Sequence, residues 1–376
     1  MIQKTPWHSW KNGNLARGCK LCVKGEKTIL FITGLCSKST LCYYCPIADN
    51  RSGKDVIYAN ETKITNINEL FNEIKLCSSK GMGITGGDPL MKLNRTIEYI
   101  KAVKQEFGKD FHIHLYCPME LVSDESLKKL YEAGLDEIRF HLDIENKINW
   151  NKLDIARKFR WKIGIEIPVV PGKEDNYIGI ISFIKGKVDF LNLNELEVSD
   201  SEVCKLADKG FEPKNDFSYA IKGSEELALG LLKRSEDMNI HYCTIKLKDD
   251  IQIPQRLKNR LKNIKHKFDD VNGCNIIRGA IYTRELKPGF GYRNMLENIK
   301  DKEFIIKNLE NIKSDLMKKL SISKDMMAVD SSKLRILTSK QIVKKFRDKI
   351  KSADLIPAIV EELPSGDLFE IEIEFL

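Results

Sequence analysis

The chain has 376 residues, of which 42% are hydrophobic and 31% charged, with a net charge of +8. No apolar run reaches the roughly 18 residues of a membrane span, and the polar start MIQKTPWHSW lacks the apolar region of a signal peptide. We therefore expect a cytoplasmic protein that does not enter a membrane. In that compartment its ten cysteines are expected to be metal ligands, catalytic groups or buried thiols rather than disulfides. The modest positive charge permits an anionic partner such as RNA but does not require one.

Residues 1–28 show no periodic pattern, and from residue 29 short apolar strands alternate with amphipathic helices. The expected strands are 29–32, 81–86, 111–117, 137–142, 163–170 and 190–198, with a possible seventh at 240–245. Strands that alternate with helices form parallel βαβ units. Six such strands in succession predict an α/β fold with a partial or full (β/α) barrel. The ligands of such barrels bind at the carboxyl ends of the strands.

The alternation stops near residue 247. Beyond it the pattern predicts a basic helix at 255–268, a strand at 275–283, a long polar helix at 302–320 and a second strand at 334–337. A helix is expected after the cap candidate Ser339, and a final strand at 368–375. This succession is typical of a small α+β domain. We expect an N-terminal extension at 1–28, a barrel at 29–246 and a C-terminal substrate or partner domain at 247–376.

Three cysteines, Cys36, Cys42 and Cys45, follow the first barrel strand. Thiolates select zinc, copper(I) or an iron–sulfur cluster. Two of them are two residues apart and can bind one centre from a single turn. The third can reach the same centre across a longer loop, because the cost of loop closure rises slowly with length. Three ligands rather than four would leave one iron of a cubane cluster open to a non-protein ligand.

This strand and cysteine loop, with Tyr44 before the last cysteine and the later motif Gly86-Gly87-Asp88-Pro89, resemble the radical S-adenosylmethionine (SAM) superfamily. In that superfamily three cysteines hold a [4Fe–4S] cluster, and SAM chelates the fourth iron. Reduction by one electron cleaves SAM to methionine and a 5′-deoxyadenosyl radical, which abstracts a hydrogen atom from the substrate. The spacing here is C-x5-C-x2-C rather than the usual C-x3-C-x2-C, and the glycine motif ends in Asp-Pro rather than Glu-Pro.

More narrowly, strings such as GITGGDPL and HYCTIKLKD look similar to an uncharacterised, largely archaeal branch that is related to pyruvate formate-lyase activating enzyme. The resemblance implies cluster ligation by Cys36, Cys42 and Cys45. It implies SAM contacts from Tyr44, Gly86, Gly87, Asp88, His141, Asp143 and Glu166. The tyrosine would touch adenine, the glycine motif would hold the methionyl amino group, and the strand-end residues would approach the ribose, the methionyl carboxylate or adenine. The chemistry also implies a low-potential electron donor of the ferredoxin or flavodoxin type.

Each of these assignments has a structural alternative. The alternative for the glycine pair is a tight turn between strand and helix. A polar side chain at the end of a barrel strand can support a ligand-binding residue without touching the ligand. The roles of the last three residues therefore stay open at this point.

A second thiol pair, Cys19 and Cys22, gives two further hypotheses. Together with Cys42 and Cys45 it fits the spacing of a four-cysteine zinc site, which would belong to a non-catalytic zinc-binding nucleic-acid-binding protein. That interpretation leaves Cys36 without a role and places an apolar strand between the two pairs. Alternatively, the pair ligates an auxiliary cluster or structural metal with a thiol from a strand end (Cys117, Cys204 or Cys243), or it packs against the barrel as reduced thiols.

The basic helix expected at 255–268 bears on the substrate. Its apolar stripe would dock on the protein and its charged face would point outward, either toward RNA phosphates or into solvent. We interpret the chain as a radical SAM enzyme with RNA modification as the first substrate hypothesis. Activation or modification of a protein or peptide, including a glycyl-radical enzyme, is the second, and a small metabolite is the third.

Overall fold

The computed structural model describes residues 2–37 and 42–376. Their contacts divide the chain after Asn259 into two compact units. The boundary expected after residue 246 lies within the first unit, and so do residues 2–28, for which a separate extension was expected. No helix among the described residues is long and apolar enough to cross a membrane.

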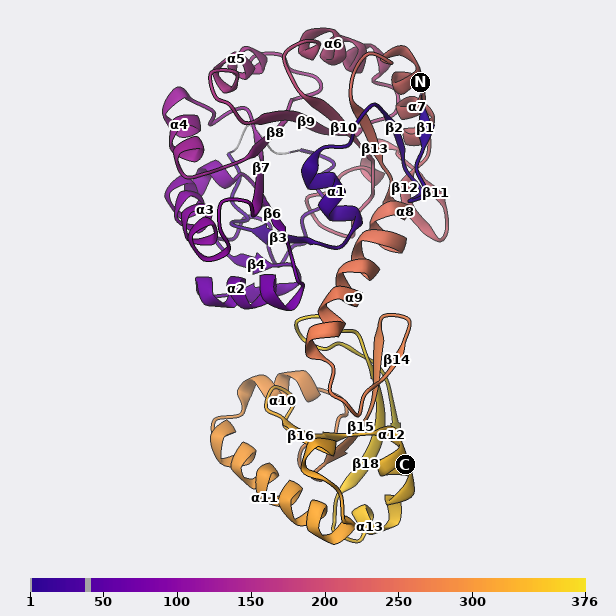
Figure 1. The fold of residues 1–376 in the computed structure, drawn as a ribbon. Coiled ribbons are helices and arrows are strands. Elements are labelled where there is room, and N and C mark those ends of the chain that lie inside the picture. Colours follow the sequence, from indigo (N-terminus) through magenta and orange to yellow (C-terminus); the bar gives the residue numbers. More distant parts are fainter. Residues whose placement is uncertain (1, 38–41) are drawn as a thin grey trace. The chain divides into compact units, whose positions relative to one another are not determined.

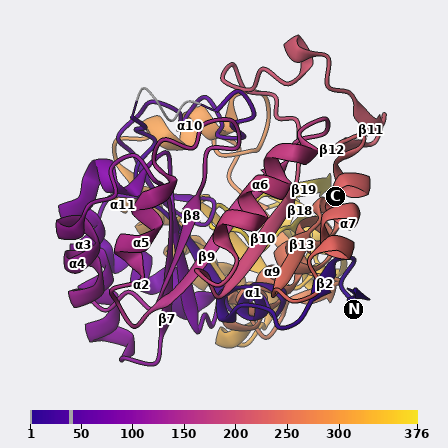
Figure 2. The same ribbon diagram turned by 90° about the horizontal axis from the view of Figure 1, so that it is seen from above.

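The first unit is built on a curved 11-stranded sheet (Figure 1). Its parallel strands are, in spatial order, β13 (Ile240–Cys243), β10 (Phe190–Glu195), β9 (Lys162–Val169), β8 (Glu137–His141), β7 (His112–Pro118), β6 (Gly81–Thr85) and β3 (Lys27–Phe31). The strands β7 to β10 and β13 run side by side in Figure 2 as well. The order has two ends, so within the described chain the predicted (β/α) barrel is partial rather than full.

Antiparallel strands extend both edges of this sheet. β1 (Gln3–Lys4) and β2 (Trp10–Asn12) lie beyond β13, while β4 (Ile57–Ala59) and β5 (Thr62–Ile64) lie beyond β3. A separate hairpin is formed by β11 (Pro213–Asn215) and β12 (Ser218–Ile221). The expectation that the first 28 residues are irregular is therefore wrong, because strands of two or three residues carry no periodicity that a sequence pattern could show.

Helices cover the convex face of the sheet (Figure 1). They are α2 (Ile67–Leu76), α3 (Leu93–Phe107), α4 (Asp124–Glu132), α5 (Leu153–Ala156), α6 (Glu174–Ile184) and α7 (Ser224–Arg234). Local sequence fixes where some of them begin, since the side chains of Asn66 and Ser123 accept backbone N–H groups in the first turns of α2 and α4. Outward strand residues such as Leu115, Phe140 and Ile165 are fully buried beneath them.

The concave face is different, because the residues that alternate with this apolar set are polar. They include Lys27, His112, His114, Glu137, Arg139, Asn192 and His241, all buried. Helix α1 (Arg17–Val23) lies inside the arc against this face (Figure 1). A Cβ on Gly18 would lie 2.6 Å from Arg139 Nη2 and 2.7 Å from the His114 ring. Only glycine therefore lets α1 approach the polar interior so closely.

Three helices follow β13. α8 (Ile245–Leu247) is capped by Thr244, and α9 (Ile253–Ile264) comes after a π-helical turn. The basic helix thus ends four residues earlier than the expected position 268. Its charge is also not all outward, because the Arg256 side chain is largely buried and pairs with Glu61. Arg256 and Glu61 are far apart in the sequence, so the periodicity of the helix could not reveal their contact.

The second unit is the predicted α+β fold. Its six-stranded antiparallel sheet contains β14 (Asp270–Asn272), β15 (Asn275–Tyr282), β16 (Met327–Asp330), β17 (Arg335–Thr338), β18 (Ile356–Glu362) and β19 (Glu370–Phe375), in the order β16-β17-β15-β18-β19 with β14 on β15. The helices are α10 (Tyr292–Asn298), α11 (Lys302–Leu320), α12 (Lys340–Lys345) and α13 (Arg347–Lys351). Ser339 caps α12 as expected, accepting the N–H of Ile342.

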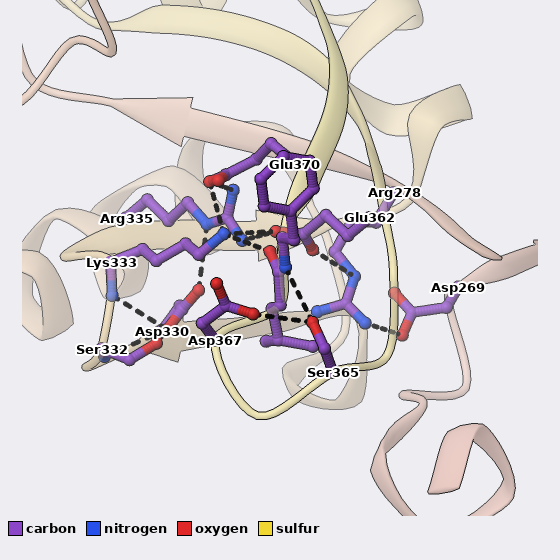
Figure 3. Close-up of polar contacts among 12 residues, drawn as sticks. Asp269, Arg278, Asp330, Ser332, Lys333, Arg335, Glu362, Ser365, Asp367 and Glu370 are labelled. Carbon is purple, nitrogen blue, oxygen red and sulfur yellow. Dashed lines mark hydrogen bonds and ion pairs between the residues drawn. The ribbon is translucent and has the colours of Figure 1, made fainter. Parts of the chain in front are cut away.

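A buried network of charges holds the strands of this unit together (Figure 3). Arg335 and Glu362 are both fully buried and pair directly. Arg335 Nε also lies 3.0 Å from Asp330, and Lys333 Nζ lies 3.2 Å from Glu362. Removing one member of such a network leaves an uncompensated buried charge.

We expect Glu362→Gln to destabilise the second unit by about 3–5 kcal/mol, because Arg335 and Lys333 would lose their shared carboxylate. Native-state hydrogen exchange of the β15 and β18 amides measures this free energy. The exposed Glu374 supplies a matched control, and Glu374→Gln should change it by less than about 0.5 kcal/mol. Equal effects of the two substitutions would contradict a structural role for the network.

Candidate active site

A cavity of about 930 Å³ runs through the first unit, from α1 to the loop that follows β3. This volume is near the upper end of the range found for small-molecule sites. The carboxyl ends of the parallel strands contribute much of its wall, which is where ligands of such sheets bind. Its lining includes Cys19, Cys22, Cys36, Cys42, Cys45, Cys117 and Cys243.

The segment before Cys36 is held against the end of β6 by backbone contacts. The Gly87 N–H donates to Thr33 O and the Asp88 N–H to Leu35 O, each at 2.8 Å. A Cβ on Gly87 would lie 2.4 Å from Leu35 O and 2.6 Å from Cys36 Sγ. The glycine at this position therefore lets the cysteine loop approach the strand end, which is a packing role that its expected contact with SAM does not require.

The side chain of Asp88 has a structural use. It is fully buried and does not line the cavity. Its Oδ1 accepts the Leu90 N–H at 2.9 Å and so caps a short 3-10 helix (Pro89–Lys92). Burial raises the pKa of this carboxyl to about 6. The contact of Asp88 with SAM stays a prediction, and one oxygen of its carboxylate is already used as a helix cap.

Tyr44 lies beside two other predicted site residues, His141 and Cys42. Its hydroxyl and His141 Nε2 are hydrogen-bonded at 3.1 Å, and Cys42 Sγ lies 3.9 Å from the same nitrogen. Burial lowers the pKa of His141, so its imidazole is neutral at neutral pH. Burial also raises the pKa of Cys42 to about 11. Metal binding at this thiol must therefore displace its proton.

The cysteine loop is supported from its other side by the segment after β10. Lys205 N–H donates to Tyr43 O at 2.7 Å, and Tyr44 forms a backbone bridge with Cys204. Ser199 Oγ also lies 3.5 Å from Cys45 O. No sequence pattern pointed to this contact, which joins residues 154 positions apart.

Glu166 belongs to a hydrogen-bonded network rather than standing alone at a strand end. Its carboxylate accepts from Arg139 Nη1 at 2.7 Å, Asn192 Nδ2 at 2.8 Å and Asn194 Nδ2 at 3.2 Å. Against the effect of burial, these partners hold the pKa of Glu166 below its usual value. The carboxylate is thus charged and lines the cavity beside both asparagines.

Arg139 is the centre of this network. It is 1% exposed, and its Nε donates to Glu137 Oε1 at 2.6 Å while Nη1 donates to Glu166. Sequence reasoning missed Arg139 and the two asparagines. The alternation of polar and apolar residues in EIRFH and FLNLNE carried the signal, since it places them on one face of each strand.

Asp143 lines the cavity, but its side chain already has a structural use. Asp143 Oδ1 accepts the N–H groups of Glu145 and Asn146 at 2.9 and 2.8 Å, which shapes the loop after β8. Such local hydrogen bonds are typical of aspartate in turns.

The described residues contain one compact group with metal-ligand spacing, formed by His112, His114 and Glu137. Arg139 Nη2 lies 2.5 Å from the same Glu137 carboxylate, so a cation already occupies the place of a metal ion. No four-cysteine group of this kind occurs in that part of the chain. A tetrahedral zinc site would bring its thiols to within about 4 Å of one another. The geometry therefore does not support zinc at Cys19, Cys22, Cys42 and Cys45.

Comparisons with known proteins agree with this architecture. Residues 30–183 match the radical SAM superfamily. A protein of Methanocaldococcus jannaschii, named "Putative glycyl-radical enzyme activating enzyme MJ0021", is 48% identical over 265 residues, covering 68% of this chain and 70% of that protein.

Two solved structures are similar to the chain at low identity and low TM-score. The coproporphyrinogen III oxidase HemN of Escherichia coli, a radical SAM enzyme, is 11% identical with a TM-score of 0.37, covering 92% of this chain and 94% of that chain. Streptococcus suis SuiB bound to its precursor peptide SuiA is 12% identical with a TM-score of 0.39, covering 58% and 48%.

Gly87→Ala tests the packing of the cysteine loop. The added Cβ would collide with Leu35 O and Cys36 Sγ, so we expect the variant to lose more than half of the iron that the wild type binds after anaerobic reconstitution. Gly230→Ala on α7 is the control, because a Cβ there meets nothing within 4 Å. Equal iron contents, measured by chemical analysis, would show that the loop does not need this glycine.

Glu137 predicts an acid-sensitive interior. Burial acts to raise the pKa of Glu137, but the charge of Arg139 outweighs this effect, and the pKa is lowered to about 2. The stabilisation, about 3 kcal/mol, is present above the unfolded pKa near 4.5 and is lost as the pH falls toward 2. Urea unfolding at pH 6 and pH 3 should differ by about 2 kcal/mol through this group in the wild type, because pH 3 still lies above the folded pKa, and by less in Glu137→Gln. An undiminished pH effect in that variant would assign the acid sensitivity to other groups; the exposed Glu132→Gln is the control.

Proposed function

Because the chain belongs to the radical SAM superfamily and is therefore an enzyme, we propose that it activates a glycyl-radical enzyme by abstracting a hydrogen atom from a glycine of that protein. The observation that carries this proposal is the identity of 48% to the M. jannaschii protein, whose name states such an activity. The non-catalytic zinc-protein interpretation is excluded by the family. RNA modification, the first substrate hypothesis from the sequence, becomes the second candidate.

The residues present fit the cofactors of the family, a [4Fe–4S] cluster and SAM. Cys36, Cys42 and Cys45 line one cavity at the carboxyl ends of the strands. They do not gather within 4.8 Å of one another, which a cluster tolerates because each thiol binds a different iron. We propose that these cysteines hold the cluster and that Gly86, Tyr44 and His141, which line the same cavity, lie against SAM.

When bound and reduced, these groups supply a 5′-deoxyadenosyl radical that abstracts the hydrogen atom. The chain's own residues position the bound groups and exclude water from them. Tyr44 and His141 fix each other through their hydrogen bond beside Cys42. Arg139 and the asparagines keep Glu166 charged and immobile at the cavity wall, where it can hold polar groups of a ligand. The electron donor is proposed to be a low-potential ferredoxin or flavodoxin type.

The cavity, at about 930 Å³, lies within the size range of small-molecule sites, which suits the SAM-binding role proposed for it. Support for RNA is weaker, because Arg256 of the basic helix α9 forms an ion pair with Glu61. A phosphate-tracking surface requires cations that are free to face the nucleic acid.

Transfer of deuterium into 5′-deoxyadenosine tests the substrate class. The reconstituted, dithionite-reduced enzyme is incubated with SAM and either the protein fraction of its native host grown on deuterated glycine or the RNA fraction of the same host grown with deuterated nucleosides. We expect a mass increase of about one unit in 5′-deoxyadenosine from the protein fraction only. Transfer from RNA only, or unlabelled product from both fractions while SAM is cleaved, would overturn the proposal.

Matched cysteine variants make the result specific to the cofactor site. Cys42→Ala should abolish SAM cleavage and lower the iron content, since it removes a proposed ligand. Cys274→Ser in the second unit, whose thiol lies 3.6 Å from its neighbour Asn275 Oδ1, should retain both. Cleavage by Cys42→Ala at the wild-type rate would contradict the assignment of the cluster.

A further inference from the structure

The deep half of the cavity holds three thiols that the proposed cofactors do not use. Cys19 and Cys22 are three residues apart on α1 and therefore share one face of that helix. Cys243 is the last residue of β13. All three line the cavity. Of the three thiols considered as partners for Cys19 and Cys22, Cys243 lies on the strand beside Asn192, which binds Cys19. Cys204 instead adjoins Tyr44, and Cys117 follows Leu115 in the outward set of β7.

Hydrogen bonds and strand register place these thiols around one region. Asn192 Nδ2 donates to Cys19 Sγ at 3.2 Å. On the neighbouring strand, His241 is the register partner of Asn192, and Cys243 is the partner of Asn194. Cys19 therefore contacts β10 at Asn192, and Cys243 lies opposite Asn194, the next inward residue of that strand. Gln252 Nε2 lies 3.9 Å from the Cys243 thiol and closes the far side.

His241 adds a fourth donor. It is 4% exposed, lines the cavity, and has a buried Nδ1 without a hydrogen-bond partner among the described residues. Its Nε2 lies 3.1 Å from Ser9 Oγ. A neutral imidazole that donates through one nitrogen presents a lone pair on the other, as metal-ligating histidines do.

The charge around the thiols favours anionic ligands. Lys27 is 7% exposed and lines the cavity together with Cys19 and Cys22. Lys248 lies beside Cys243 and shares its charge with Glu197 at 3.1 Å. Thiolates in this place would compensate both cations.

We propose that Cys19, Cys22, Cys243 and His241 bind a second iron–sulfur cluster inside the partial barrel. The thiols do not lie within 4.8 Å of one another, so they suit a cluster with several irons better than a single zinc ion. Histidine in place of a cysteine is an established form of cluster ligation. The proposal is independent of the substrate and of the first cluster, although both centres would face one cavity.

The test removes the first cluster and looks for the second. The full-length variant Cys36→Ala/Cys42→Ala/Cys45→Ala is reconstituted anaerobically with iron and sulfide. We expect it to retain about two to four irons per chain and matching sulfide, with a charge-transfer chromophore. Adding Cys22→Ser and Cys243→Ser should remove at least nine-tenths of this iron, whereas adding Cys274→Ser should leave it unchanged.

Three results would overturn the proposal. The first is a folded triple variant, judged by circular dichroism, that binds no iron and sulfide. The second is iron retained after the two further substitutions. The third is zinc bound in place of iron after reconstitution. If the quintuple variant does not fold, Cys22→Ser alone in the triple background keeps the test valid, because this thiol is only partly buried and its loss should still lower the iron by more than half.

His241→Ala separates a ligand from a packing residue. In the triple background it should shift the electron paramagnetic resonance g-values of the reduced cluster, because an imidazole ligand is replaced. His241→Cys should restore the iron content with a lower reduction potential, since thiolate in place of imidazole lowers it. Unchanged g-values in His241→Ala would remove the histidine from the ligand set.

Discussion

The pairing of Arg139 with the buried Glu137 and the partly buried Glu166 organises the interior of the first unit. One side of the guanidinium binds Glu137 and the other binds Glu166. A buried cation between two anions is stable only while all partners are present. Arg139 leaves no room for a Cβ at position 18, so α1 can pack here only with glycine. The network also holds Glu166 at the cavity wall. The polar face of the sheet is thus both the support of α1 and the wall of the candidate site.

The described part of the cysteine loop is held by contacts outside this network. It is held between the end of β6, where Gly87 permits a close backbone approach, and the segment after β10, where Lys205 binds Tyr43. Neither contact involves a thiol. The cysteines can therefore be brought together before a metal is bound, and the protein supplies the position while the cluster would supply the chemistry.

Much of this fold was predictable, and the misses have physical causes. The parallel strands and the α+β unit followed from apolar runs of four or more residues, in which side-chain burial leaves a visible period. α1 is seven residues long and Ala16 at its start makes no side-chain cap, so it has no such signal. A motif gives a residue but not the direction of its side chain, and only the structure shows that Asp88 Oδ1 caps a short helix.

The sequence by itself determined the family, the cysteine loop and the strand order along the chain, because these depend on residue type, spacing and local period. Only the tertiary structure decided which polar residues meet. Cys19 and Cys243 are separated by more than 200 positions, and they line one cavity because α1 enters the arc of the sheet beside β10 and β13. Contacts of this kind arise from chain folding over long separations, and no local pattern records them.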